Sequence, residues 1–193
     1  MTGESAAANL VVCYAPTEAN PNAELKEVLW KKLGHLVKPI PTKDLLFVLI
    51  DANARTGKRI EGCDHGSVLG AYARHELNNN STRPLSLASD NKLALTNTFF
   101  TARNGGFSHT FNGINSGNDR KRVDYILTRQ AQLPRVYDVE IHPQPPSPAT
   151  TDSDHNIVYA LVLLSGRIAP NRRIRQKKQT QPFDRQKFRS DGN

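Results

Sequence analysis

Polar side chains with the potential for chemistry stand where apolar runs of this 193-residue sequence end. A polar group at such a position is costly to bury unless it is paired. The ends of strands are also where an α/β sheet presents its functional groups. Six candidate residues share this placement, at or near a strand end: Tyr14, Asp51, Asn53, Asp124, Asp154 and His155.

The residue types in this set are typical of a metal site that acts on phosphate esters. Three carboxylates that converge repel one another and tend to recruit a divalent cation. With an imidazole beside them, they are suited to metal-assisted hydrolysis of a phosphate ester. Taken singly, each residue also has an ordinary structural interpretation: a turn for Asp51 and Asn53, an ion pair of Asp124 with Arg120 or Arg122, a cap or surface pair for Asp154 and His155, and core packing for Tyr14.

The elements that position these side chains follow from the apolar pattern. Residues 10–14 are an apolar run stopped by Pro16, which predicts a strand. Asn20, Pro21 and Asn22 predict the start of a helix, since Asn caps helices and Pro suits the first turn. Pro39 and Pro41 end this helix, and its predicted apolar face consists of Leu25, Val28, Leu29, Leu33 and Leu36.

The rest of the chain reads as strands and loops. Residues 45–50 are continuously apolar, which predicts a strand covered on both faces. We expect a surface loop at 78–84, a short helix at 90–94 and a strand at 95–100. A tight turn at 104–106 predicts a hairpin in which 107–111 pairs back. Further strands are expected at 122–128, 136–141 and 156–164, giving about seven strands and one clear helix in a mostly β, layered α/β domain.

Positive charge is concentrated at one end of the chain. Lys and Arg number 26 and Asp and Glu 18, a formal net charge of +8. Residues 167–193 hold nine basic and two acidic side chains, a net of +7, so the remainder is nearly neutral. Such a tail indicates either an anionic partner, with nucleic acid first, or a solvated linker. Its candidate nucleic-acid contacts include Arg172, Arg173, Arg175, Lys177 and Lys178.

The remaining composition argues against a membrane or secreted protein. No apolar run approaches the roughly 18–20 residues of a membrane span, and the first residues lack the pattern of a secretory signal. Two cysteines, Cys13 and Cys63, make no disulfide framework and fit reduced thiols. We therefore expect no membrane partner and an intracellular location.

An ordered set of six motifs resembles the endonuclease/exonuclease/phosphatase superfamily. Within it, the set is most similar to the apurinic-type endonuclease domains of LINE-type retrotransposons and to craniofacial-development-protein-like sequences. The resemblance covers residues 9–165, and although each motif is weak alone, six in the right order are specific. They are Val12-Cys13-Tyr14-Ala15-Pro16-Thr17, Ile50-Asp51-Ala52-Asn53-Ala54, Asn97-Thr98-Phe99-Phe100, His109-Thr110-Phe111, Arg122-Val123-Asp124-Tyr125-Ile126-Leu127 and Ser153-Asp154-His155-Asn156.

The resemblance implies both a fold and a chemistry. The fold class would be α/β, the C-terminal portion of a four-layer α/β sandwich with two face-to-face β-sheets. The activity would be metal-dependent endonuclease cleavage of DNA phosphodiesters with Mg²⁺ or Mn²⁺. The implied roles are phosphate contact for Tyr14, handling of water or the leaving oxygen for Asp51, a hydrogen bond to phosphate or nucleophile for Asn53, metal binding for Asp154 with Asp51, and charge stabilisation by His155 oriented by Asp124.

The sequence departs from the family pattern in several places. Ile50 replaces the usual glycine, Ala52 a bulky residue, and Phe111 a tryptophan found in many relatives. The first part of the family domain, which carries the metal-binding glutamate, has no counterpart, and neither Glu4 nor Glu18 lies in a comparable motif.

We therefore expect three segments in this chain. Residues 1–8 would be a disordered start, 9–165 the C-terminal part of the domain, and 166–193 a basic, disordered tail. In an intact element that tail would lead to a reverse transcriptase, and the protein would act in the nucleus.

Two functions of different classes remain open at this point. The first is a retrotransposon-type DNA endonuclease, N-terminally truncated. The second is a non-catalytic remnant that binds nucleic acid through its tail. The missing glutamate favours the second for activity, whereas the retained acidic and histidine residues favour the first for ancestry. A phosphatase of inositol phosphates or sphingomyelin is disfavoured by the basic tail.

Overall fold

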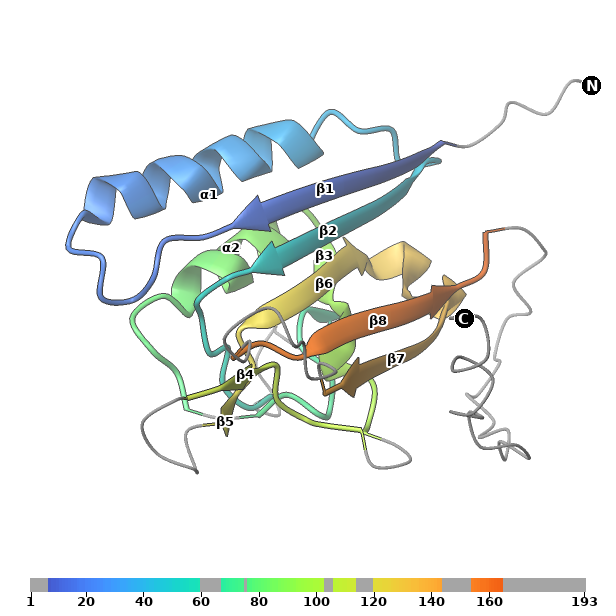
Figure 1. Ribbon diagram of the computed structural model, residues 1–193. Coiled ribbons are helices and arrows are strands. Elements are labelled where there is room, and N and C mark those ends of the chain that lie inside the picture. The colour runs from blue at the N-terminus through green and yellow to red at the C-terminus, as the bar shows by residue number, and fades with distance from the viewer. Residues whose placement is uncertain are drawn as a thin grey trace, which may run out of the picture.

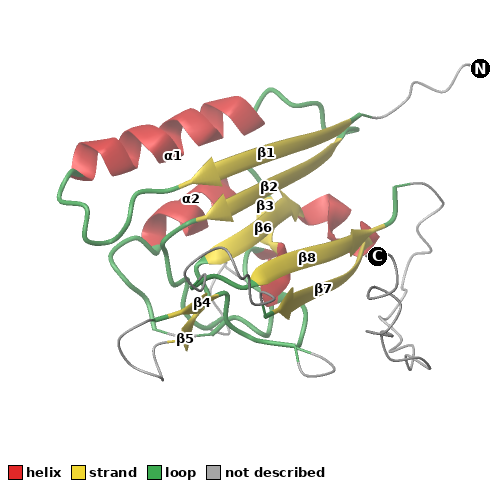
Figure 2. Ribbon diagram, viewed as in Figure 1, coloured by secondary structure: helices red, strands yellow, loops and turns green. Residues whose placement is uncertain are grey.

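The computed structural model describes residues 7–59, 67–74, 76–102, 106–113, 120–143 and 154–164. Figures 1 and 2 show the strands with the long helices packed on one side of them. In chain order the elements are β1 (Ala8–Tyr14), α1 (Ala23–Val37), β2 (Leu45–Asp51), α2 (Thr82–Asp90), β3 (Leu93–Leu95), the 3₁₀ helix η2 (Thr96–Thr98), β4 (Phe111–Asn112), β5 (Arg120–Lys121), β6 (Asp124–Arg129), the 3₁₀ helix η3 (Gln130–Arg135), β7 (Val136–His142) and β8 (Ile157–Val162).

The main sheet has four strands in the order β1-β2-β6-β3. β1 and β2 are parallel and joined by α1, while β6 runs antiparallel to β2 and β3. Parallel strands start at the same end of a sheet, so the chain must return to that end between them, and α1 makes this crossover. Two antiparallel pairs, β4–β5 and β7–β8, complete the described strands. This mixed α/β arrangement of several sheets agrees with the predicted fold class.

Helices cover one face of the main sheet. Alternation along β2 directs Leu46, Val48 and Ile50 to this face, where they form one core with Trp30 of α1 and Leu87 of α2. The side chain of the N-cap residue Asn22 accepts the Leu25 N–H at 2.8 Å, which fixes the start of α1 as predicted.

The opposite face of the sheet is covered only in part. The β7–β8 pair packs beside β6 and buries a smaller cluster of Phe100, Val136 and Val139 (Figure 1). Phe47 and Leu49 of β2, on this face, are only partly buried. The prediction that residues 45–50 are covered on both faces was therefore wrong for this second face.

The face of α1 also differs from the prediction. Leu25, Val28 and Leu36 are exposed, and the buried residues are Lys26, Trp30, Leu33 and Val37. Trp30 has the larger apolar surface to bury, and its ring lies in the core between α1 and α2. Lys26 is buried because its stem lies along the core while its ammonium group donates to the Glu18 carbonyl at 2.9 Å.

The segment between β2 and β6 contains the other corrections. A helix, α2, occupies residues 82–90, where a loop and then a later helix were expected. The Asn- and Ser-rich run before it is a helix start, and Pro84 is tolerated in the first turn. The strand expected at 95–100 ends at Leu95, because the Thr98 hydroxyl donates to the Leu95 carbonyl at 2.6 Å and closes a 3₁₀ turn instead.

The predicted hairpin of residues 107–111 was also wrong. The Phe107 N–H donates to the Ile141 carbonyl of β7, and β4 pairs with β5. Asn104 and Gly105 of the turn expected at 104–106 lie outside the described residues, as do Cys63 and the ends 1–6 and 165–193. In the part of the chain that the structure describes, no helix combines the length and apolar character needed to cross a bilayer.

Candidate active site

Three of the six candidate side chains form a row across neighbouring strands. Tyr14 of β1 lies opposite Asp51 of β2, and Asp51 lies opposite Asp124 of β6. Directly paired residues of adjacent strands point to the same face of a sheet. The register therefore places both carboxylates and the phenol at one end of the main sheet, on the face away from the helices.

His155 lies against this row. Its Nδ1 is 3.0 Å from Oδ2 of Asp124, within hydrogen-bond distance. Its Nε2 is 3.9 Å from Oδ2 of Asp51 and 3.9 Å from Oδ1 of Asp154. The structure thus brings three aspartates and one imidazole together, and the expected contact between His155 and Asp124 is present.

The segment that carries Asp154 and His155 is held by β4. The Asn112 N–H donates to the Asp154 carbonyl at 2.7 Å, and the Asn156 N–H donates to the Thr110 carbonyl at 2.7 Å. The Phe111 and His155 rings meet edge to face, 5.2 Å between centroids. This backbone pairing fixes the side from which the imidazole approaches the sheet.

Asp124 is fixed at the start of β6 by its backbone. The Thr110 hydroxyl oxygen accepts the N–H groups of Val123 at 3.0 Å and Asp124 at 3.1 Å. The Asn97 side chain donates to the Asp124 carbonyl at 2.9 Å. The buried Arg122 guanidinium donates to backbone carbonyls, among them Ser108 at 3.0 Å. The alternative pairing of Asp124 with Arg122 is therefore replaced by the bond to His155.

Asn53 contacts Asp51 through its backbone. Its φ of 45° lies in the left-handed region, where Asn is one of the few tolerated residues. The Asn53 N–H donates to Oδ1 of Asp51 at 2.9 Å, and the Asn53 side-chain amide donates to the Ala15 carbonyl at 2.8 Å. The structure thus joins Asn53 to the site, while its role toward a phosphate stays a prediction.

Tyr14 and Asp154 are more exposed to solvent than Asp51 and Asp124. The Tyr14 side chain is 64% exposed, which excludes the core-packing interpretation. The Asp154 side chain is 37% exposed, compared with 13% for Asp51 and 21% for Asp124. The site is therefore open on the side of Tyr14 and Asp154 and closed around Asp51.

The local charges shift two protonation equilibria. The hydrogen bond to Asp124 raises the pKa of His155 above its ordinary value, and the nearby Asp51 and Asp154 carboxylates add to this rise. Burial is the main cause that raises the pKa of Asp51, and the like charges of Asp124 and Asp154 contribute. The cluster therefore favours imidazolium at His155 and resists the ionisation of Asp51.

The donor set fits a divalent cation. Ligand atoms of Asp51, Asp124 and His155 all lie within 4.8 Å of one another. Burial raises the pKa of Asp51 most, the like charges of Asp124 and Asp154 add to it, and a cation would relieve that added repulsion. Carboxylate oxygens suit both Mg²⁺ and Mn²⁺.

Several positioning residues were not singled out from the sequence. Three residues of the family motifs, to which the resemblance assigned no role, bind backbone near the site: Thr110, Asn97 and Asn156. Their place in the family motifs was the available signal. The candidate tail contacts Arg172, Arg173, Arg175, Lys177 and Lys178 lie outside the described residues.

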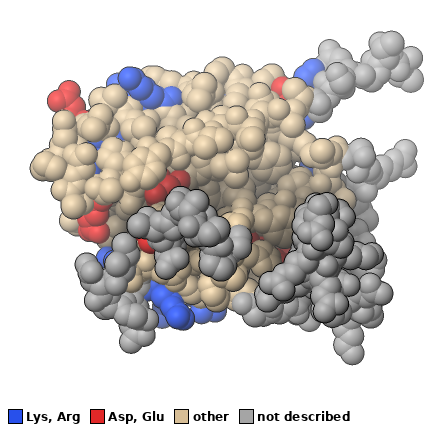
Figure 3. Space-filling model, in the orientation of Figure 1, with Lys and Arg blue, Asp and Glu red and all other residues tan. Residues whose placement is uncertain are grey.

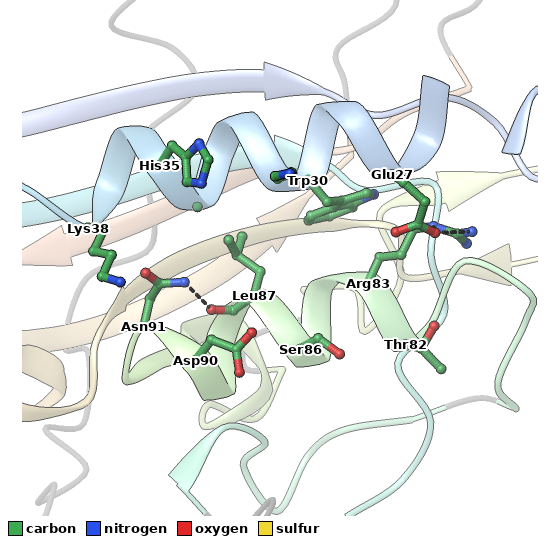
Figure 4. Close-up of a pocket in the computed structure, with 12 residues that line it drawn as sticks. Glu27, Trp30, His35, Lys38, Thr82, Arg83, Ser86, Leu87, Asp90 and Asn91 are labelled. Carbon is green, nitrogen blue, oxygen red and sulfur yellow. Dashed lines mark hydrogen bonds and ion pairs between the residues drawn. The ribbon is translucent and has the colours of Figure 1, made fainter. Parts of the chain in front are cut away.

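A groove of about 410 Å³ lies elsewhere, between α1 and α2 (Figure 4). The Arg83–Glu27 ion pair, at 2.8 Å, lies along it, and Trp30 points into the space between the helices. None of the six candidate residues lines this groove. It is therefore separate from the candidate site.

The comparison with solved structures shows the class of fold. An AP endonuclease from Archaeoglobus fulgidus matches 80% of this chain with a TM-score of 0.54 and 16% identity. A 3′-5′ exonuclease from Neisseria meningitidis matches 78% with a TM-score of 0.53 and 17% identity. This chain spans 61% and 60% of the lengths of those two proteins. The chain has the α/β sandwich fold of the endonuclease/exonuclease/phosphatase superfamily, as the six motifs indicated.

The sequence comparison adds particular relatives. Craniofacial development protein 2 from Bos taurus is 29% identical over 176 residues, and that from Tragulus javanicus is 28% identical over 176 residues. Both alignments cover 90% of this chain, which spans only about a quarter of the relatives' length. The predicted similarity to craniofacial-development-protein-like sequences is thereby confirmed. No family model matches the chain.

Proposed function

We propose that this chain carries the aspartate–histidine part of a metal-dependent phosphodiesterase site that acts on DNA. The observation that carries the proposal is His155, whose Nδ1 is bound to Asp124 and whose Nε2 faces Asp51 and Asp154. A carboxylate on one ring nitrogen fixes the imidazole tautomer and leaves the other nitrogen for a reacting oxygen.

The roles of the chain's own groups follow from their positions. Asp124 orients the His155 ring and favours its charged form, which stabilises negative charge developing on a phosphate oxygen. Asp51 accepts a proton from, or orients, the attacking water. Tyr14, exposed beside Asp51, donates a hydrogen bond to the phosphate. Asn53 contributes a further hydrogen bond from the turn after β2.

A divalent cation supplies charge neutralisation and Lewis acidity at such a site when bound. Asp51 and Asp154 are the proposed holders of Mg²⁺ or Mn²⁺. Both carboxylates face the same ring nitrogen of His155, and Asp154 is the more exposed of the two.

DNA as the substrate is supported by the charge around the site. Arg120 and Lys121 form β5, which pairs with the β4 strand that holds the His155 segment. In Figure 3 basic side chains gather at the lower rim of the view, over the region of β4 and β5. One Neisseria structural neighbour is a 3′ phosphatase bound to a product DNA hairpin, and this chain matches it at 18% identity. A retrotransposon-type endonuclease remains the finer form of the proposal.

Nicking of supercoiled plasmid tests the proposal. The full chain is assayed with Mg²⁺, with Mn²⁺ and with excess EDTA, beside His155→Ala and the matched control His142→Ala. His142 is an exposed histidine paired with Glu140. Metal-dependent nicking that His155→Ala abolishes and His142→Ala retains supports the proposal. Nicking that survives His155→Ala contradicts it.

The alternative is a nucleic-acid-binding protein without catalysis. The observation that favours it concerns Glu18, the acidic residue nearest in sequence to Tyr14. Its carboxylate bonds Asn78 and Asn79, so Glu18 does not replace the metal-binding glutamate of the family. DNA binding by the full chain with no metal-dependent nicking would select this alternative. The same gel and a fluorescence-anisotropy titration distinguish the two functions.

A further inference from the structure

A segment of polar residues, which we call the asparagine clamp, holds the turn that follows β2. The clamp consists of Asn78, Asn80 and Ser81, and Glu18 binds its outer side. Asn80 and Ser81 are each only 1% exposed, although both are polar. Buried polar side chains of this kind are retained where their hydrogen bonds fix a backbone.

The bonds of the clamp converge on the backbone of Asn53. Its carbonyl accepts the side-chain amide of Asn80 at 3.0 Å and that of Asn78 at 3.2 Å. The Asn80 amide also donates to the Pro16 carbonyl at 3.2 Å, which joins the turn to the segment after β1.

The residue next along the turn, Arg55, is held as well. The Asn78 side-chain oxygen accepts the Arg55 N–H at 3.0 Å, and the Ser81 hydroxyl donates to the Arg55 carbonyl at 2.5 Å. Two residues of the same turn, Asn53 and Arg55, are thus bound by side chains from one distant segment.

The consequence reaches Asp51. Asn53 has a positive φ, a conformation that costs free energy unless its surroundings stabilise it. In that conformation its N–H holds Oδ1 of Asp51, so that Oδ2 faces Nε2 of His155. A turn released to negative φ would lose this bond and let the carboxylate rotate.

We propose that Asn80 is a positioning residue for Asp51, acting through the Asn53 turn, with Asn78, Ser81 and Glu18 completing the clamp. This inference rests on the proposed function for its catalytic meaning. Its structural content is independent of activity.

Hydrogen exchange of the full chain, followed by NMR, gives the first test. Asn80→Ala should speed exchange of the Asn53 amide by about tenfold, since the side-chain bonds to the Asn53 and Pro16 carbonyls are lost. The Ile50 amide, within β2, should be unchanged. The matched control is Asn79→Ala: Asn79 is exposed, and its backbone N–H bonds Glu18. It should leave both amides unchanged. Unaltered Asn53 exchange in folded Asn80→Ala overturns the proposal.

A second variant applies if Asn80→Ala does not fold. Glu18→Ala removes the exposed acceptor of the Asn78 side-chain amide and should speed Asn53 exchange about threefold. No change in that variant also overturns the proposal.

Kinetics separate this inference from the proposed function. If the parent chain nicks plasmid, Asn80→Ala should lower kcat about tenfold with KM within twofold, since orientation and not DNA binding is lost. A tenfold rise in KM with kcat unchanged would contradict a positioning role for Asn80. If the parent does not nick plasmid at all, the proposed function fails, and the exchange result still decides whether the clamp holds the Asn53 turn.

Discussion

Asp124 and His155 are 31 residues apart in the sequence, and their side chains meet at 3.0 Å. Because that bond is the largest cause of the raised His155 pKa, Asp124→Asn should lower this pKa toward its ordinary value near 6.5. Asp154→Asn, which removes a carboxylate 3.9 Å away, should lower it less. Titration of the His155 ring protons by NMR measures both. Equal shifts in the two variants would contradict the assigned pairing.

The same bond gives a pH dependence of stability. A histidine whose folded pKa exceeds its unfolded pKa stabilises the fold fully at pH below the unfolded value. That contribution declines as pH rises through the folded pKa of His155. Urea unfolding between about pH 5 and 8 should show this decline in the parent and a weaker one in Asp124→Asn.

Thr110→Val should destabilise the protein by about 1–3 kcal/mol, because two N–H groups at the start of β6 lose their acceptor in a buried place. Valine matches threonine in shape, so the loss reports the hydroxyl. The free energy of unfolding in urea is the measurement. The control is Thr82→Val at the exposed start of α2, expected within about 0.5 kcal/mol. Equal losses of unfolding free energy at both positions would contradict the stabilising role assigned to the Thr110 hydroxyl.

Cleavage by this chain should be slow. In the described residues the site offers aspartates but no glutamate, since Glu18 bonds Asn78 and Asn79. The metal-binding glutamate of the family is the missing group, and loss of one electrostatic or acid–base group typically costs about 10²–10⁴ in rate. Single-turnover nicking in Mg²⁺ gives the rate, with His155→Ala as the inactive reference. Robust cleavage that His155→Ala abolishes would refute the slow rate and establish the enzyme.

The exposed face of β1 should cause self-association. Leu10 and Val12 are 65% and 75% exposed and lie opposite Phe47 and Leu49 on the partly covered sheet face. An apolar patch on an edge strand promotes pairing between chains. We expect Leu10→Thr/Val12→Thr to reduce association in sedimentation velocity at rising concentration.

The control for this prediction is Leu36→Gln on α1, a residue 54% exposed on the helix and outside the sheet face. It should leave association unchanged. A parent chain that stays monomeric across the concentration range, with a cooperative thermal transition, would show that this face does not drive association.

The basic tail should bind nucleic acid without sequence preference. If about half of its nine basic groups meet phosphates, the slope of log K against log salt should be near −4 for duplex DNA. Removal of everything after Gly166 should flatten that slope and weaken all sequences about equally. Replacement of Arg172, Arg173, Arg175, Lys177 and Lys178 by glutamine should do the same at full length. Unchanged affinity and slope would make the tail a solvated linker.

The sequence by itself determined three strands of the main sheet, β1, β2 and β6, and most of the candidate site. Apolar runs indicate β1 and β2, an alternating pattern indicates β6, and the ends of these strands place Tyr14, Asp51 and Asp124. The helix start at Asn22 was also predictable, because a side-chain cap is a local interaction. These features depend on residues that are neighbours in the chain, so their physical cause is visible in the sequence.

Only the tertiary structure decided which distant segments meet. Three contacts join residues far apart in sequence: the Thr110 hydroxyl with the N–H groups at the start of β6, the asparagine clamp with the Asn53 turn, and Trp30 of α1 with Leu87 of α2. Side-chain bonds to backbone have no periodicity, and the Asn- and Ser-rich run before α2 resembles a loop in sequence because its side chains bond the distant turn after β2. The partly covered face of β2 has the same cause: an apolar run records that a strand can be buried, whereas the path of the rest of the chain decides what covers it.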